Sequence, residues 1–140
     1  MSTTPADYNA KVIEEFRANE GRVDSLGGMP VLLLHHTGAR SGESYVNPLA
    51  YLRDGGRYVI YASKAGAPTN PAWYHNLKAH PQARIEVGSE TLDVRAAEAT
   101  GEERERLFRA QADALPQFAE YAQKTDRVIP VLVLTPAQAA

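Results

Sequence analysis

Two short turns most constrain what this chain can fold into. The turn DGG (54–56) separates SYVNPLAYL (44–52) from RYVIYAS (57–63), and both flanking segments are rich in β-branched and aromatic residues. The turn GS (88–89) lies between two shorter segments in which apolar and polar residues alternate. Strands joined this closely pair as antiparallel hairpins, because a parallel pair needs a crossover connection of about a dozen residues or more. The sequence therefore predicts two β-hairpins.

Two apolar runs complete the predicted sheet. PVLLLHH (30–36) adds a strand before the first hairpin and VIPVLVL (128–134) adds one after the second, so we expect about six strands. Because proline has no N–H to donate to a ladder, Pro48 and Pro130 are expected at bulges or sheet edges. Hairpin-connected strands with inserted helices favour a small antiparallel β-barrel of the α+β class.

The N-terminal segment 1–21 is predicted to form an amphipathic helix. Tyr8, Val12 and Phe16 recur at helical spacing, and the pattern stops at Gly21. The opposite face is acidic, which favours docking on the chain's own core over contact with anionic lipid headgroups. Peripheral membrane contact through this helix is the less favoured alternative.

Three further helical segments are expected within one domain, 1–140. The first runs from Pro71 to about Ala79, with Asn70 as its N-cap. The second follows Thr100, which forms a capping box pattern with Glu103. The third is a short segment from 116 to about 124.

The composition argues against several classes of function. The 140 residues include no cysteine, so disulfides, thiol nucleophiles and thiolate metal sites are excluded and redox chemistry would need a borrowed cofactor. A net charge of −2 gives no basic footprint for nucleic acid. No metal site is expected, since the adjacent His35 and His36 point to opposite faces of a strand and His75 and His80 lack the three- or four-residue spacing of one helical face. With no secretion signal and no transmembrane segment, we expect a cytoplasmic protein.

Two loops carry groups suited to an anionic ligand. TGARSG (37–42) places Arg40 and Ser41 between two glycines after a strand, where backbone N–H groups can converge on an anion. SKAGAPTN (63–70) combines a hydroxyl, a lysine and a glycine and leads into a helix N-terminus. Trp73 and Leu77, four residues apart on that helix, either wall the flat part of such a ligand or pack in the core.

Four segments carry a family resemblance. The chain resembles the actinobacterial deazaflavin-dependent nitroreductases, which are split β-barrels, from about residue 15 to residue 136. The segments that carry it are TGARSGESYVNPLAYL, YVIYASKAGAPTNPAWYHNLKAHP, GEERERLF and TDRVIPVLVLTP. The resemblance implies binding of the 8-hydroxy-5-deazaflavin coenzyme (coenzyme F-420). It also implies hydride transfer from the reduced coenzyme to an electron-poor acceptor such as a quinone or nitro compound.

The resemblance also implies a set of site residues. The implied cofactor-binding residues are Arg40, Ser41, Tyr45, Asn47, Pro48, Ser63, Lys64, Ala65, Gly66 and Ala67. The implied substrate pocket contains Leu115, Phe118 and Tyr121, and the proton comes either from solvent or from a catalytic hydroxyl, that of Tyr121 or Ser63. The chain departs from the family pattern in three respects. Its first loop has one cation where many relatives have two, and Tyr45 stands where some relatives carry arginine. Tyr121 is the only hydroxyl in a segment that supplies several tyrosines in nitro-reducing members.

Three alternatives stay open at this point. Other split barrels bind FMN through similar loops, so an FMN-dependent oxidoreductase is the first. A non-catalytic deazaflavin carrier is the second, because the substrate segment has few hydroxyls. A haem-binding barrel with His35 or His36 as an axial ligand is the third. Homo-oligomers are compatible with each of these, and the partner in the leading hypothesis is a small-molecule electron acceptor.

Overall fold

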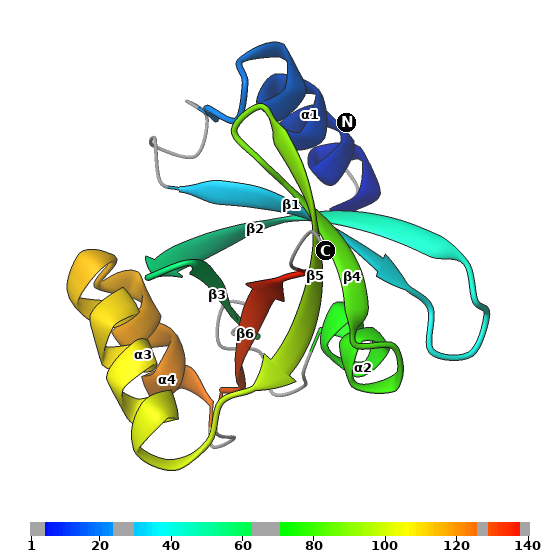
Figure 1. Cartoon of the computed structure of the whole chain (residues 1–140). Coiled ribbons are helices and arrows are strands. Elements are labelled where there is room, and N and C mark those ends of the chain that lie inside the picture. Colours follow the sequence, from blue (N-terminus) through cyan, green and yellow to red (C-terminus); the bar gives the residue numbers. More distant parts are fainter. Residues whose placement is uncertain (1–4, 24–29, 63–70, 126–128, 138–140) are drawn as a thin grey trace.

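The computed structural model describes residues 5–23, 30–62, 71–125 and 129–137 (Figure 1). Within these ranges it contains six strands and four helices, in the mixed order that the sequence predicted. The elements are α1 (Pro5–Ala18), β1 (Val31–Thr37), β2 (Ser44–Asp54), β3 (Arg57–Tyr61), α2 (Ala72–Ala79), β4 (Gln82–Val87), β5 (Glu90–Glu98), α3 (Gly101–Ala114), α4 (Gln117–Lys124) and β6 (Val131–Pro136).

The strands close into an antiparallel barrel in the order β1-β2-β3-β6-β5-β4. Both predicted hairpins are confirmed: Asp54 pairs with Arg57 across the first turn, and Val87 pairs with Glu90 across the second. Closure comes from β1, which pairs with β2 on one side and with β4 on the other. The predicted α+β barrel is therefore the observed fold class.

Alternate residues of each strand fill the barrel. Leu32 and Leu34 of β1, Ile60 of β3 and Leu132 and Leu134 of β6 all belong to one interior cluster and are almost fully buried. Helix α2 closes one end of the barrel, because its Trp73 and Leu77 belong to the same cluster. Of the two interpretations left open for this pair, core packing is the one observed.

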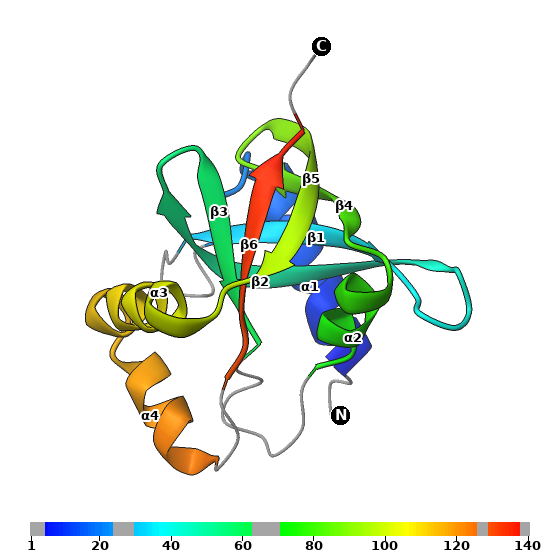
Figure 2. The same cartoon turned by 60° about the horizontal axis from the view of Figure 1, so that its bottom comes forward.

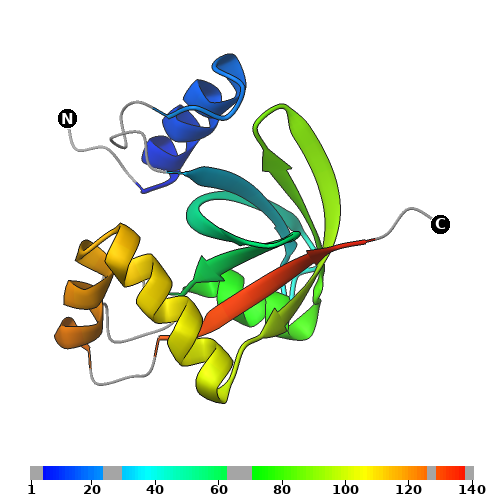
Figure 3. The same cartoon turned by 60° about the vertical axis from the view of Figure 1, so that its left-hand side comes forward.

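The intervening residues face outward and are covered by helices. Val59 and Tyr61 of β3 and Val133 of β6 pack beneath α3 and α4. On another side of the barrel, Val31 and Leu33 of β1 pack beneath α1 (Figures 2 and 3). These strands are buried on both faces, which explains why they read in the sequence as continuous apolar runs rather than as alternating ones.

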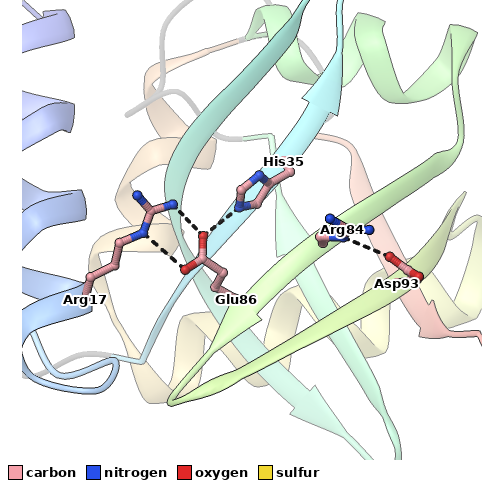
Figure 4. A network of polar contacts seen from close by, with 5 residues as sticks. All are labelled: Arg17, His35, Arg84, Glu86 and Asp93. Carbon is pink, nitrogen blue, oxygen red and sulfur yellow. Dashed lines mark hydrogen bonds and ion pairs between the residues drawn. The ribbon is translucent and has the colours of Figure 1, made fainter.

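Helix α1 docks on the barrel through an apolar face and a polar clamp. Val12 and Phe16 are buried against β1. Arg17 donates two hydrogen bonds to Glu86 of β4, at 2.7 and 3.2 Å, and Glu86 also contacts His35 of β1 at 2.6 Å (Figure 4). The Arg17 guanidinium holds the pKa of the Glu86 carboxyl below its ordinary value. The predicted docking of this helix on the core is confirmed, and no helix among the described residues is long and apolar enough to cross a membrane.

Local predictions at the helix ends were less accurate. Thr100 is the N-cap of α3, but its side chain makes no capping hydrogen bond, so the predicted capping box is wrong. The physical reason is Gly101, whose φ of +57° lies outside the right-handed helical region that a capping box requires at this position. Pro71 is the N-cap of α2 rather than its first residue, and Asn70 lies outside the described residues.

The two strand prolines lie where their missing N–H groups cost little. Pro48 pairs with Leu33 of β1, in the half of β2 that precedes its pairing with β3 at Tyr51. Pro130 immediately precedes β6, and its carbonyl accepts a hydrogen bond from the N–H of Ala62 at 2.9 Å. Both observations agree with positions at the edge of a ladder.

Candidate functional site

An open cavity of about 800 Å³ lies where the β1–β2 hairpin meets α2. Four residues of the predicted cofactor set line it together: Arg40, Ser41, Tyr45 and Asn47. The other lining residues come from the same hairpin and from α2, and they are His36, Gly38, Ala39, Ala72, His75 and Asn76.

The cavity extends the barrel interior, and the inward-facing side chains that line it are polar. Along β1 the inward-facing row runs from Leu32 and Leu34 to His36, and along β2 it runs from Leu49 to Asn47 and Tyr45. The last pair between β1 and β4 is at His35, so beyond it the β1–β2 hairpin projects past the barrel beside α2 (Figures 1 and 2). The inward row becomes polar where it leaves the apolar core.

The turn that carries Arg40 is closed by backbone hydrogen bonds. The N–H of Gly38 donates to the carbonyl of Glu43 at 2.8 Å, and the N–H of Gly42 donates to the carbonyl of Gly38 at 3.0 Å. Gly42 has φ of +72°, a conformation that favours glycine. Ser41 Oγ accepts from the N–H of Glu43 at 3.2 Å. The turn therefore has a defined shape, while Arg40 at its tip is exposed.

His36 lies at the inner wall of the cavity and is 5% exposed. Its Nε2 is 2.7 Å from Asn47 Oδ1 and its Nδ1 is 3.0 Å from Asn76 Nδ2. Its ring stacks on that of Tyr45 with the centroids 5.7 Å apart. Burial lowers the pKa of His36 from its ordinary value, so the buried imidazole is neutral at pH 7.

His35 lies on the opposite face of β1, in the Glu86 and Arg17 clamp shown in Figure 4. The predicted divergence of the two adjacent histidines is thus confirmed. Asn76 of α2 reaches back to the hairpin, and its Oδ1 accepts from the N–H of Ala39 at 2.9 Å. The face of α2 that carries Ala72, His75 and Asn76, next to its buried Trp73 and Leu77, accordingly forms one wall of the cavity.

The remaining predicted residues fall elsewhere. Ser63, Lys64, Ala65, Gly66 and Ala67 lie outside the described residues. Pro48 is in β2 but does not line the cavity.

The predicted substrate residues lie on or next to α4. Phe118 is 5% exposed and packs edge-on against Tyr61, with ring centroids 5.7 Å apart. Tyr121 is half-buried beside Phe118, and Leu115 packs in the same cluster. Within the described residues, this group and the cavity are separate sites.

Sequence reasoning did not place in the cofactor site two cavity residues that each make two hydrogen bonds, His36 and Asn76. A usable signal existed for His36, because the period of two that buries Leu32 and Leu34 places it on the same face. For Asn76 the signal was weaker. It lies three residues after Trp73 on a helix whose partner could not be identified from the sequence.

The donor set of the cavity suits a ligand rich in anionic or carbonyl oxygens. Arg40 supplies a guanidinium, Ser41 and Tyr45 supply hydroxyls, and Asn47 supplies an amide. No aspartate or glutamate is among the described lining residues, although Glu43 Oε2 accepts a hydrogen bond from Tyr45 at 3.2 Å. Guanidinium and N–H donors bind phosphate and carboxylate oxygens most strongly, so the cavity fits a ligand that carries phosphate or carboxylate groups.

Comparison with known proteins gives consistent results. Residues 9–136 match the F420H(2)-dependent quinone reductase family. An F420H(2)-dependent quinone reductase of Mycobacterium tuberculosis is 39% identical over 125 residues, which make up 86% of this chain and 84% of the relative.

Two solved structures are similar in both sequence and fold. One is described as an F420-H2 dependent reductase and superposes with a TM-score of 0.70 at 42% identity, covering 75% of this chain and 93% of the other. The other is described as a domain-swapped dimer and superposes with a TM-score of 0.71 at 37% identity, covering 94% of this chain and 99% of the other.

Proposed function

The chain belongs to the F420H(2)-dependent quinone reductase family, and from this premise we propose that it transfers a hydride from the reduced deazaflavin coenzyme to a quinone. The observation that carries the proposal is the cavity between the β1–β2 hairpin and α2, with four of the expected cofactor residues on its walls. A smaller electron-poor molecule such as a nitro compound is a second acceptor to test.

The cavity residues have distinct roles in this proposal. Arg40 binds an anionic group of the coenzyme, and Ser41 and Tyr45 donate hydrogen bonds from the same wall. In the sequence, residues 63–70 connect the end of β3 to α2, and α2 lines the cavity. We therefore infer that Ser63 to Ala67 complete the cofactor site. When bound, the reduced deazaflavin supplies the hydride, and the protein contributes proximity, orientation and electrostatics.

The acceptor is proposed to lie against α4. Leu115 and Phe118 present an apolar surface, and Tyr121 carries a hydroxyl beside them. A hydroxyl aimed at a developing oxyanion lowers the barrier to hydride addition, and it also offers a proton to the reduced oxygen. We therefore assign to Tyr121 the stabilisation or protonation of the reduced quinone oxygen, with Ser63 as the alternative source.

The direct test combines equilibrium binding with steady-state reduction of menadione. Binding is followed through the fluorescence of Trp73, the sole tryptophan, which is buried in α2 next to the cavity. Arg40→Ala and Lys64→Ala should weaken deazaflavin binding, whereas Arg95→Ala, an exposed arginine outside this cavity, should leave it unchanged. Tyr121→Phe should lower turnover with the deazaflavin affinity unchanged.

The alternatives give different results in the same assays. Tighter binding of FMN than of the deazaflavin would identify a flavin-dependent oxidoreductase and overturn the proposal. Deazaflavin binding without single-turnover hydride transfer to menadione would identify a carrier. Binding of haem, but of neither FMN nor the deazaflavin, would refute the assignment of the deazaflavin as the cofactor. Sedimentation of the purified chain tests whether it forms a homo-oligomer, since one similar structure is described as a domain-swapped dimer.

A further inference from the structure

Four groups around the cavity form one continuous chain of hydrogen bonds. The N–H of Ala39 bonds to Asn76 Oδ1 at 2.9 Å, and Asn76 Nδ2 bonds to His36 Nδ1 at 3.0 Å. His36 Nε2 bonds in turn to Asn47 Oδ1 at 2.7 Å. The chain joins the Arg40 turn to α2, α2 to β1, and β1 to β2.

The direction of every bond in this chain follows from its first member. A backbone N–H can only donate, so the Asn76 oxygen faces Ala39 and the Asn76 nitrogen faces His36. That nitrogen can only donate, so His36 Nδ1 carries no proton. A neutral imidazole then has its proton on Nε2, which donates to the Asn47 oxygen. The amide nitrogen of Asn47 is what remains to offer to a ligand.

We propose that Asn76 and His36 are positioning residues that orient the Asn47 amide as a hydrogen-bond donor to the ligand and hold the Arg40 turn against α2. The identity of the ligand, the deazaflavin coenzyme, rests on the proposed function. The directions of the hydrogen bonds in the chain do not rest on the proposed function, because they follow from the protein's own groups alone. Asn47 lines the cavity, and within the described residues its nitrogen has no protein partner.

The ordering requires a neutral His36. A second proton would go to Nδ1 and face the Asn76 NH₂ group, so two donors would oppose each other and the chain would break. Burial lowers the pKa of His36, which keeps the ring neutral at pH 7. The other titratable or charged groups around it are His35 beside it on β1, Tyr45 stacked on it from β2, Arg40 in the turn and His75 on α2.

The decisive variant is Asn76→Asp. An aspartate at this position still accepts from the N–H of Ala39, but its second oxygen needs a donor from His36 Nδ1. The protonated imidazole provides that donor and keeps its Nε2 bond to Asn47. In this variant the chain of hydrogen bonds is therefore complete when His36 is charged. In the wild type the ordered form is the neutral one. The deazaflavin affinity of the wild type should therefore rise with pH, and that of Asn76→Asp should fall.

The experiment measures deazaflavin affinity of both proteins from pH 5 to 8. Because both bind the same ligand, the ratio of wild-type to Asn76→Asp affinity cancels the ligand's own titration. We expect this ratio to rise with pH, by up to about tenfold per unit where His36 titrates. His80→Gln changes an exposed histidine at the far end of α2 that does not line the cavity, and its ratio to wild type should be constant.

A ligand-free measurement separates this proposal from the proposed function. In ¹⁵N-labelled protein at neutral pH, the His36 ring signals, assigned by their loss in His36→Gln, should show a protonated Nε2 and an unprotonated Nδ1. The opposite tautomer, or an affinity ratio independent of pH, would overturn the proposal. If the expected tautomer is found but the wild type binds no deazaflavin, the proposed function fails and the hydrogen-bond chain stands. In that case Asn76 and His36 still orient the Asn47 amide, and its donor serves whichever ligand the cavity binds.

Discussion

Substituting Gly38 with alanine should damage ligand binding through a collision that the structure specifies. A Cβ on Gly38 would lie 2.3 Å from Ser41 Oγ and 3.0 Å from Tyr45 Cε2. Atoms in favourable contact are about 3.5–4.0 Å apart, so the Ser41 hydroxyl must move by about 1 Å or more and the Tyr45 ring must shift. Moving that hydroxyl also breaks its 3.2 Å hydrogen bond from the N–H of Glu43.

The magnitude follows from these two losses. Overpacking costs about 1–3 kcal/mol and a lost hydrogen bond about 0.5–1.5 kcal/mol. Because the affected groups are the walls of the proposed coenzyme site, we expect the deazaflavin Kd to rise by about 10- to 100-fold, or about 1.4–2.8 kcal/mol. Titration of the Trp73 fluorescence measures this directly, and urea unfolding shows how much of the cost falls on stability instead.

Two controls decide whether the collision is the cause. Gly56→Ala adds the same methyl group at a turn where nothing lies within 4 Å, and it should change neither affinity nor stability appreciably. Ser41→Ala removes the nearest obstructing atom, so Gly38→Ala should cost less in the Ser41→Ala background than in the wild type. Strictly additive effects, or an unchanged Kd in Gly38→Ala, would refute the reasoning.

Three further predictions concern stability. Gly21→Ala should destabilise more in urea than Gly55→Ala: both glycines have positive φ, +98° and +63°, but only the Gly21 Cβ would meet backbone, at 2.6 Å from Gly88 Cα, while Gly55 has nothing within 4 Å. Equal losses would show that the turn after α1 and the β4–β5 turn are not in close contact. Tyr61→Phe removes the hydroxyl that donates to the Leu107 carbonyl at 3.0 Å in a buried site, and it should cost about 1–3 kcal/mol of unfolding free energy. A loss no greater than that of an exposed control, Tyr45→Phe, would contradict this. The pKa of Glu86 is lowered on folding, chiefly by Arg17, so its contribution is complete above the ordinary carboxyl pKa of 4.5 and is lost as the pH falls through the lower folded value. The stability difference between wild type and Glu86→Gln should shrink over that acidic range, and a difference independent of pH would argue against the clamp.

Most of the fold could be predicted because its signals are local. A two-residue glycine turn between β-rich segments permits only a hairpin, and two such turns with the flanking apolar runs define the six strands. The error at Thr100 was also local. The capping pattern was present, but Gly101 adopts a left-handed conformation that the pattern does not report.

The site was predictable only in part. Arg40, Ser41, Tyr45 and Asn47 share one hairpin, and a resemblance within that hairpin was enough to group them. His36 was considered only as a possible haem ligand and not as a cavity residue, since nothing in the chain alone shows that Asn47 and Asn76 lie on its two sides. The residues 63–67 stay a prediction, because they lie outside the described part of the chain.

The sequence by itself determined the strands, the two hairpins, the helix positions and the composition of the turn that carries Arg40, because each depends on contacts between residues close in the chain. The tertiary structure decided the rest. Barrel closure brings β1 beside β4, and docking of α2 across the barrel end brings Asn76 to residues 40 and 37 positions earlier, His36 and Ala39. Only that packing turns two asparagines and a histidine into an ordered chain of donors and acceptors, because the direction of each hydrogen bond is set by a neighbour from another element.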